Sequence, residues 1–401
     1  PVFVEPFDPN DKDTSSPVST PHLKYLSSRQ ALLDLKNFVL YQKTQSLPSH
    51  TVWITFGGSY PGFLAGWARQ HFPNLIDAAV SNSANHQVRL EFRGYKEHQG
   101  WNLQYPLIGG RQDCLHIVME GHYEIAQSLQ TNDDARREEV AELFGLCDAD
   151  SLLEQDNVNM WLGDGVLDIP SQTNDPACGD VTCNMGKVCE VLVHDLEVAK
   201  LTPMEALAHV AKIQQDIHAH TYMDDDNFEV CITLDWNATL EYFATPHKSM
   251  AGGTRSWLWQ TCTEFGYYQT CPEDSMCPFG RGFHTLDADL SICEVAFGLN
   301  ETQVRTNVEA TQAWYAPQKT LDVTTRILSL QGDVDPWSVL TNDDTVQNVH
   351  WVVGASHHFW THPSKPTDTR EVQEARHYLY TQIIEWFLPQ EGSIASQEEK
   401  G

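Results

Sequence analysis

One serine in this sequence has the neighbours that a catalytic nucleophile requires. Ser59 lies in the segment 57–62 (GGSYPG), between a short apolar run and a helical stretch. A sharp strand-to-helix turn strains the backbone of its serine, so small neighbours prevent clashes, and the Tyr60 N–H at the helix start can face a developing oxyanion. Because position 61 is proline, the strict G-x-S-x-G pattern is broken, and a purely structural glycine-rich turn stays open as the alternative.

A base and an orienting acid for this serine are found late in the chain. Asp335 follows a strand-like run at 325–330, and His357 follows another at 349–353. In an open α/β sheet, the loops after such strands lie at the same carboxyl edge as the serine turn, and the chain order Ser, Asp, His is that of α/β-hydrolases. We therefore predict that His357 takes the proton of Ser59, that Asp335 holds the imidazole tautomer and that Tyr60 N–H stabilises the oxyanion.

Each of these residues has a simpler interpretation. Asp333 or Asp335 could cap a turn, and His358 competes with His357 for the role of base. Together with His362 the two histidines also raise the question of a metal site. No carboxylate or cysteine at ligand spacing completes such a site, so we expect no metal and no cofactor.

The cysteines and the overall charge restrict the compartment and the partners. The ten cysteines lack the paired C-x2-C spacing of zinc sites, and we expect disulfides. N-x-S/T triplets at Asn237 and Asn300 agree with glycosylation on a secretory route. A formal charge of −30 argues against nucleic-acid binding and suits a mildly acidic compartment. We expect a secreted or a lysosomal or endosomal protein.

The start of the chain and its most apolar run do not predict a membrane segment. The first residues lack the basic and apolar regions of a signal peptide, so we expect that a signal was removed or that the chain begins late. The run 51–68 is broken by glycines and a proline, which predict a strand, a turn and a helix in place of a membrane span. The expected partner is a peptide substrate, and a homodimer is kept open as the oligomeric state.

The elements that must position these residues follow from hydrophobic periodicity. At the front we predict an irregular segment over 5–22, a helix over 28–43, a strand over 51–56 that is buried on both faces, a helix over 63–72 and a strand over 76–80. The middle of the chain reads as helical, for example over 138–146 and 204–217. Strands over 325–330 and 349–353 and a helix over 369–387 follow.

The economical architecture is an α/β-hydrolase sheet domain with a large, mainly helical cap inserted between the nucleophile and the acid. The sheet domain comprises residues 1–99 and 316–401, and the Cys-rich cap comprises residues 100–315. The alternation of strand, helix and strand around Ser59 is what a parallel sheet requires.

Four separated stretches give the chain a family resemblance. They are 23–32 (LKYLSSRQAL), 56–62 (FGGSYPG), 259–270 (WQTCTEFGYYQT) and 335–337 (DPW). These stretches resemble the serine peptidases that include lysosomal prolyl carboxypeptidase, dipeptidyl peptidase II and the thymus-specific serine protease, most of all the thymus-specific branch. In that branch a proline matching position 61 is familiar, and the matching triad is Ser59, Asp335 and His357.

The resemblance implies an exopeptidase that cuts next to proline, as a carboxypeptidase or by releasing N-terminal dipeptides, often in acidic compartments. Trp337, Trp360 and Trp259 could then line an apolar pocket for the prolyl ring, although aromatic residues are more often part of the core. An esterase on the same fold and an inactive homologue that binds peptides or proteins are the rival functions.

The front of the chain departs from the resemblance. Relatives carry a further N-terminal part of the sheet, with a glycine-containing loop expected to give the second oxyanion N–H, and we do not find it in residues 1–22. We therefore expect the N-terminal strands of the sheet domain to be missing. Loss of one oxyanion donor costs about 2.7–4 kcal/mol of transition-state stabilisation, so the activity of such a chain would be reduced.

Overall fold

The computed structural model describes residues 18–45, 47–48, 50–84, 87–131, 133–222, 231–246, 253–315, 326–341 and 349–387. The chain divides into two compact units: a first unit of residues 1–34 with 86–317, and a second unit of residues 35–85 with 318–401. The second unit is discontinuous, because residues 86–317 lie between its two segments in the sequence. The expectation that the N-terminal strands are absent concerned residues 1–22, and the irregular segment was predicted over residues 5–22. Of these, residues 1–17 lie outside the described residues.

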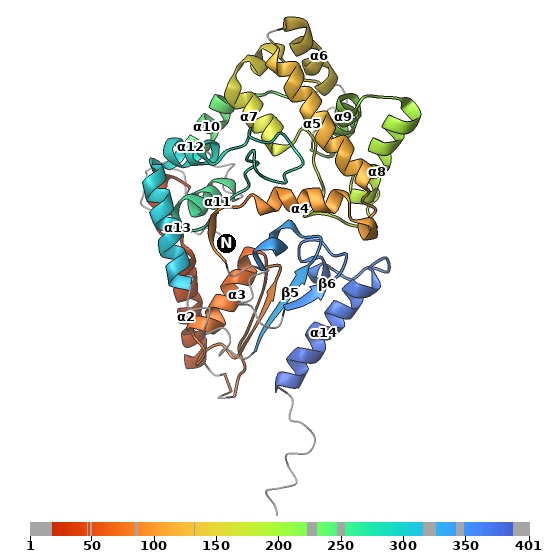
Figure 1. The fold of residues 1–401 in the computed structure, drawn as a ribbon. Helices are drawn as coiled ribbons and strands as arrows, with labels where there is room; N and C mark the ends of the chain where they lie inside the picture. Colours follow the sequence, from red (N-terminus) through yellow and green to blue (C-terminus); the bar gives the residue numbers. More distant parts are fainter. Residues whose placement is uncertain are drawn as a thin grey trace, which may run out of the picture. The chain divides into compact units, whose positions relative to one another are not determined.

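The second unit contains a four-stranded parallel sheet (Figure 1). Its strands pair in the order β1-β2-β5-β6, where β1 is Ile54–Gly58, β2 is Ala78–Asn82, β5 is Ile327–Gly332 and β6 is Val349–Val352. The register places Gly58 beside Asn82, and Asn82 beside Leu330. The carboxyl ends of β1 and β2 are therefore level, and β5 continues to Gly332, so the residues that follow these parallel strands emerge at one edge of the sheet.

Helices of the second unit pack on this sheet and close its core. Helix α3 (Tyr60–His71) packs on β1 and β2, and α14 (Arg370–Phe387) packs on β6. Helix α2 (Ser28–Thr44) spans the boundary between the units. A core cluster fills the space between the sheet and α14, and its members are Val80, Leu328, Leu330, Val352, Ala355, Phe359, Trp360, Val372, Ala375 and Leu379. Both terminal segments of the unit thus contribute to one core.

The predicted elements of the second unit are found with shifts of a few residues, with one error in burial. The helices predicted over 28–43, 63–72 and 369–387 correspond to α2, α3 and α14. Strand β1 is not buried on both faces: Phe56 is 57% exposed and Ile54 is 37% exposed. Among the described residues β1 is one of the two edge strands of the sheet, and an edge strand has a neighbour on one side only.

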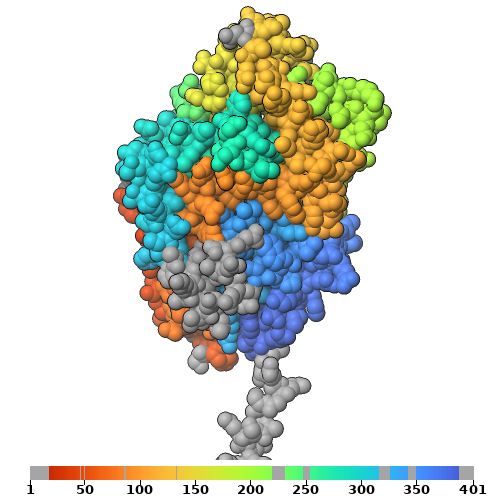
Figure 2. All heavy atoms as spheres, viewed as in Figure 1, coloured from red at the N-terminus to blue at the C-terminus, as the bar shows by residue number. Residues whose placement is uncertain are grey.

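The first unit is mainly helical, as predicted for the middle of the chain. In the space-filling view its yellow, green and cyan segments form one continuous surface (Figure 2). Its helices are α1 (Thr20–Leu23), α4 (Gly94–Leu103), α5 (Gln112–Gln130), α6 (Asp134–Phe144), α7 (Gln155–Asp164), α8 (Met185–His194), α9 (Pro203–Tyr222), α10 (Trp236–Ala244), α11 (Thr254–Gln260), α12 (Leu286–Phe297) and α13 (Glu301–Tyr315). The irregular segment was predicted to extend to residue 22, but residues 20–22 belong to helix α1. Pro21 is tolerated there because it lies in the first turn of the helix.

Short segments complete the first unit. Strands β3 (Arg89–Glu91) and β4 (Gly266–Tyr268) pair in parallel. Five disulfides cross-link this unit and use all ten cysteines, which confirms the prediction of disulfides. The pairs, which the spacing did not predict, are Cys114–Cys189, Cys147–Cys231, Cys178–Cys183, Cys262–Cys293 and Cys271–Cys277. Among the described helices, none combines the length and the apolar character needed to cross a membrane.

Candidate active site

Ser59 lies in a strained turn between β1 and α3. Its φ of 59° and ψ of −134° are unfavourable for a residue with a side chain, at a cost of about 1–3 kcal/mol. A Cβ at Gly57 would lie 2.1 Å from the carbonyl oxygen of Pro61, so only glycine is accommodated there. Pro61 itself lies in the first turn of α3, where its missing N–H costs no helical hydrogen bond. The departure from G-x-S-x-G is therefore compatible with a sharp turn.

Asp335 and His357 form a buried pair. Asp335 follows β5 and His357 follows β6, as their predicted loops required. Asp335 Oδ2 lies 2.7 Å from His357 Nδ1, and its Oδ1 accepts a hydrogen bond of 3.0 Å from the Trp337 N–H. The Asp335 side chain is fully buried. An ionised carboxylate is acceptor-only, so Nδ1 of the ring carries the hydrogen and Nε2 is left to accept a proton.

The other ring nitrogen of His357 has no hydrogen-bond partner among the described residues. This atom, Nε2, is buried. The loops that carry Ser59 and His357 touch: a Cβ at Gly58 would lie 3.2 Å from the ring of His358, whose centroid is 4.4 Å from that of His357. The structure thus pairs His357 with Asp335 and brings the neighbours of Ser59 and His357 into contact.

The residues weighed as alternatives have other surroundings. Asp333 Oδ1 accepts a hydrogen bond of 2.6 Å from Gly354 N, as a turn residue does. Burial, reinforced by the charges of His357 and His362, lowers the pKa of His358 to about 4, so its ring is neutral near neutral pH. Within the part of the chain that the structure describes, no three metal-binding side chains are grouped for an ion.

The three tryptophans assigned to a substrate pocket lie in different places. Trp337 is half-buried, with its ring centroid 6.5 Å from that of His357. Trp360 is buried in the core of the second unit and donates from Nε1 to Asn82 Oδ1 over 2.8 Å. Trp259 is half-buried in the first unit. The interior position of Trp360 is the core role weighed as its alternative, and Trp337 is the tryptophan beside the imidazole.

Sequence reasoning missed two polar residues at the end of β2. Asn82 is fully buried and Ser83 is 1% exposed. Ser83 has a φ of 42°, and its Oγ accepts a hydrogen bond of 2.7 Å from His358 N. A signal was present: Ser81, Asn82 and Ser83 place polar side chains directly after the apolar run of β2, at the edge where the Ser59 turn was expected.

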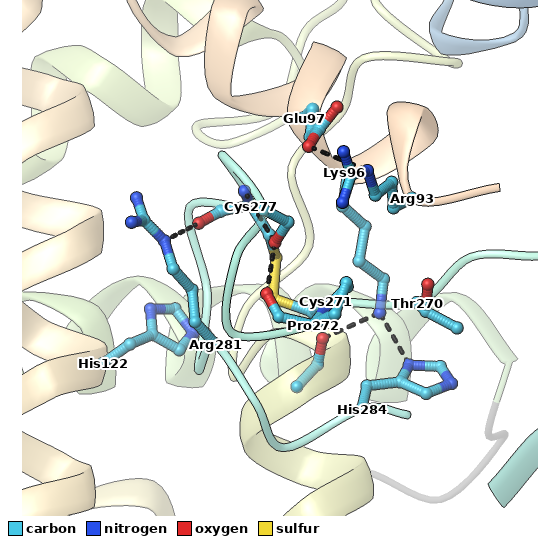
Figure 3. The surroundings of a disulfide bond; sticks show 12 residues. Arg93, Lys96, Glu97, His122, Thr270, Cys271, Pro272, Cys277, Arg281 and His284 are labelled. Carbon is cyan, nitrogen blue, oxygen red and sulfur yellow. Dashed lines mark hydrogen bonds and ion pairs between the residues drawn. A yellow bond between two sulfur atoms is a disulfide. The ribbon is translucent and has the colours of Figure 1, made fainter. Parts of the chain in front are cut away.

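A second histidine–carboxylate pair lies in the first unit. Lys96 is 2% exposed, and its Nζ lies 2.7 Å from Gly163 O, 2.8 Å from Asp164 Oδ1 and 2.8 Å from His284 Nδ1. His284 Nε2 lies 3.0 Å from Asp289 Oδ2. Both ring nitrogens of His284 are therefore occupied. Figure 3 shows Lys96 and His284 pointing toward each other beside the Cys271–Cys277 disulfide.

The electrostatics of this cluster follow from burial and pairing. Burial lowers the pKa of Lys96, although Asp164 opposes the shift. Desolvation of its carboxyl group alone would raise the pKa of Asp164, although 64% of its side chain stays exposed, but the Lys96 ammonium and the hydrogen bond with His284 hold this pKa well below its ordinary range. The carboxylate of Asp164 is thus kept ionised by its partners.

The two predicted glycosylation positions are on the surface. Asn237 lies in the first turn of α10 and is exposed. Asn300 is exposed, and its Oδ1 accepts from Gln303 N while Gln303 Oε1 accepts from Asn300 N. These two reciprocal bonds cap the start of α13. The side-chain nitrogen of Asn300, Nδ2, takes part in neither of them.

Comparison with known proteins assigns the chain to a family. The family model described as Serine carboxypeptidase S28 matches residues 13–379, most of the chain. The chain belongs to the serine carboxypeptidase S28 family. This membership confirms the resemblance read from the four sequence stretches and makes the chain a serine-type peptidase.

Relatives include the thymus-specific serine proteases of mammals. The human protein is 29% identical over 384 residues, which cover 94% of this chain and 71% of the relative. The mouse protein is 30% identical over 373 residues, which cover 91% and 70%. A protein of Arthroderma benhamiae named "Probable extracellular serine carboxypeptidase" is 24% identical over 353 residues, which cover 80% of this chain and 46% of the relative.

Proposed function

We propose that this S28 family member hydrolyses peptides from one end through a Ser59–Asp335–His357 triad. The observation that carries the proposal is the buried His357–Asp335 pair, in which Nδ1 is bound at 2.7 Å while Nε2 makes no hydrogen bond among the described residues. A base held in this way presents an acceptor nitrogen with its tautomer fixed. The strained backbone of Ser59 is the second support, because such strain is typical of a nucleophile at a strand-to-helix turn.

The reaction then proceeds in two halves. His357 Nε2 takes the proton of Ser59 Oγ, which attacks the scissile carbonyl carbon; collapse of the tetrahedral intermediate breaks the C–N bond, and His357 gives its proton to the leaving amine. Water, deprotonated by the same nitrogen, then hydrolyses the acyl-enzyme and restores Ser59. Tyr60 N–H begins α3, where the positive end of the helix favours the oxyanion.

The substrate preference is proposed from the name of a relative and from the position of Trp337. A relative is named a carboxypeptidase, which supports trimming from a chain end, and we propose a preference for proline, with Trp337 offering an apolar face beside His357. Trp259 and Trp360 have weaker claims because neither is described next to the imidazole. We further propose that the inserted helical segment acts as the cap domain, since it interrupts the sheet domain between β2 and β5 in the sequence.

The compartment is proposed from covalent chemistry. Five disulfides form and persist in oxidising surroundings, and Asn237 and Asn300 are exposed acceptors for glycans. A relative is named extracellular. We therefore propose a secreted or a lysosomal or endosomal protein, with a homodimer as the assembly to test by light scattering.

Labelling with a fluorophosphonate probe tests the activity. Only an activated serine reacts, so we expect one adduct, located at Ser59 by mass spectrometry and absent from the Ser59→Ala variant. Ser329→Ala is a matched control, because its buried hydroxyl makes no hydrogen bond among the described residues. A folded chain that is not labelled would contradict the proposal and favour a binding homologue, while cleavage of short acyl esters without cleavage of prolyl peptides would favour an esterase.

A further inference from the structure

Asn82 is a buried amide that touches both halves of the candidate site. Its backbone oxygen accepts a hydrogen bond of 2.9 Å from Ser59 N, and its Nδ2 donates over 2.9 Å to Gly57 O. Its Oδ1 accepts from Trp360 Nε1 over 2.8 Å. One fully buried residue thus holds the nucleophile turn on one side and the loop after His357 on the other.

We propose that Asn82 is a positioning residue that sets the distance between Ser59 and His357. The proposal rests on the proposed function, because it assigns Asn82 a task only if these two residues exchange a proton. Such an exchange is sensitive to position, since a displacement of about 1 Å between reacting groups costs on the order of 10²-fold in rate.

The order of the strands explains why a residue that connects the Ser59 turn to the loop after His357 is needed. Ser59 is held by β1, whereas His357 lies in a loop after β6, and these two strands are at opposite ends of the strand order. Strand β2 lies next to β1, and its last residue reaches both loops. The next residue repeats the connection, because Ser83 Oγ accepts from His358 N over 2.7 Å.

Backbone strain at this junction supports the same assignment. Ser83 has a φ of 42° and His358 has a φ of 40°, conformations that residues with side chains adopt at a cost of about 1–3 kcal/mol. A hydrogen bond joins these two strained residues, and another joins Asn82, which precedes Ser83, to Trp360, which lies two positions after His358. A purely space-filling role for Asn82 requires neither the strain nor the paired amide contacts.

The Asn82→Asp substitution tests the role with a change of a single group. An ionised carboxylate retains the acceptor for Trp360 but replaces the donor to Gly57 O with a second acceptor, whereas a protonated carboxyl group has both an acceptor and a donor. We expect kcat/KM to fall about 10- to 100-fold at pH 8 with KM nearly unchanged. As the pH is lowered, the ratio of the variant's rate to that of the wild type should rise, because the introduced carboxyl group gains its proton.

A second variant removes the partner of the Asn82 side chain. Trp360→Phe removes the N–H that reaches Asn82 Oδ1, together with the five-membered ring of this buried indole, and we expect a loss of up to about tenfold in kcat. In the double variant with Asn82→Ala, the two losses should be less than multiplicative, because both substitutions break one shared contact. Ser329→Ala, buried in the same sheet without a hydrogen bond among the described residues, should leave kcat unchanged.

The outcomes separate the two proposals. If folded Asn82→Asp has wild-type kcat at pH 8, or if its rate relative to the wild type does not change with pH, Asn82 is not a positioning residue. Independent, multiplicative losses in the double variant would also overturn it. Labelling that persists in Ser59→Ala would instead show that the proposed function is wrong, whatever the Asn82 variants do.

Discussion

The first and the second unit each bury a histidine against an aspartate, and the two pairs differ in what the second ring nitrogen does. In the second unit, His357 holds Asp335 through Nδ1, and Nε2 makes no hydrogen bond among the described residues. In the first unit, His284 contacts Asp289 through Nε2 and Lys96 through Nδ1. A ring that is bonded at both nitrogens is fixed in place, whereas a ring bonded at one nitrogen is oriented and still able to accept a proton.

This difference teaches that a histidine–carboxylate contact is not by itself a sign of catalysis. Both histidines are buried, and both pairs have hydrogen-bond lengths of 3.0 Å or less. What distinguishes them is the neighbour on the far side of the ring. In the first unit the Lys96 ammonium contacts Nδ1 of His284, whereas His357 lies next to the loop of Ser59, whose backbone is strained. We therefore expect substitutions in the two pairs to act on different measurable quantities.

The largest difference is expected from glutamine in place of each histidine. His357→Gln removes the proposed base, and kcat should fall about 10⁴- to 10⁶-fold while the protein stays folded. His284→Gln should leave the kcat of the folded protein within a few-fold of the wild type and lower its stability instead. Active-site titration combined with thermal denaturation measures both quantities, and similar kcat losses in the two variants would erase the distinction.

The acid of the second unit is expected to give the next largest effect. Asp335→Asn keeps the volume but presents a donor to Nδ1, so the ring adopts the wrong tautomer, and kcat should fall about 10⁴-fold. Asp289→Asn is the matched change in the first unit and should reduce kcat very little. A pre-steady-state measurement of acylation checks this, and a wild-type acylation rate in folded Asp335→Asn would remove the acid from the triad.

The third prediction concerns the free energy of unfolding and the Lys96–His284 contact of the first unit. Lys96→Met keeps much of the side-chain length but leaves His284 Nδ1 and Gly163 O without their donor. We expect a loss of about 2–4 kcal/mol in the free energy of unfolding. Urea denaturation measures it, with the exposed Lys43→Met as control. An unchanged midpoint would mean that the buried ammonium contributes nothing net to folding.

The smallest expected effect is on the pH dependence of stability. His122 in the first unit is also bonded at both nitrogens, to Val118 O and Val166 N, and burial lowers its pKa to about 4. The unfolded chain therefore binds the proton more tightly. The contribution of the neutral His122 ring to the free energy of unfolding is complete above pH 6.5. It is lost as the pH falls toward about 4, at a rate of up to about 1.4 kcal/mol per pH unit.

Removal of this histidine tests the sign. His122→Gln should be less sensitive than the wild type to acidification from pH 7 to pH 5, measured by urea denaturation at each pH. A steeper acid loss in the variant would contradict the assignment of a neutral imidazole. Because His122 belongs to the first unit, the kcat of the folded His122→Gln variant should stay close to that of the wild type.

Much of the fold was predictable, and the errors have physical causes. The positions of α2, α3, α14 and the four strands followed from periodicity and from glycine punctuation, which are local properties of the chain. The burial of β1 was predicted wrongly, because exposure of Phe56 and Ile54 depends on which strands flank β1, and an apolar run does not carry that information.

The residues of the candidate site divide in the same way. Ser59, Asp335 and His357 stand out in the sequence because their types, their order and their positions after strand-like runs are readable along the chain. Asn82 and Ser83 show only that polar residues follow an apolar run, because their importance comes from hydrogen bonds to residues hundreds of positions away in the sequence.

The sequence by itself determined the family, the order of the triad candidates and the presence of disulfides, since these depend on residue types and spacing alone. Only the tertiary structure decided which cysteines pair, that His357 contacts Asp335 through Nδ1, that Trp360 is interior and that Lys96 occupies His284. The physical reason is that a hydrogen bond or a disulfide requires two groups to meet within a few ångströms, and folding, not spacing along the chain, brings them there.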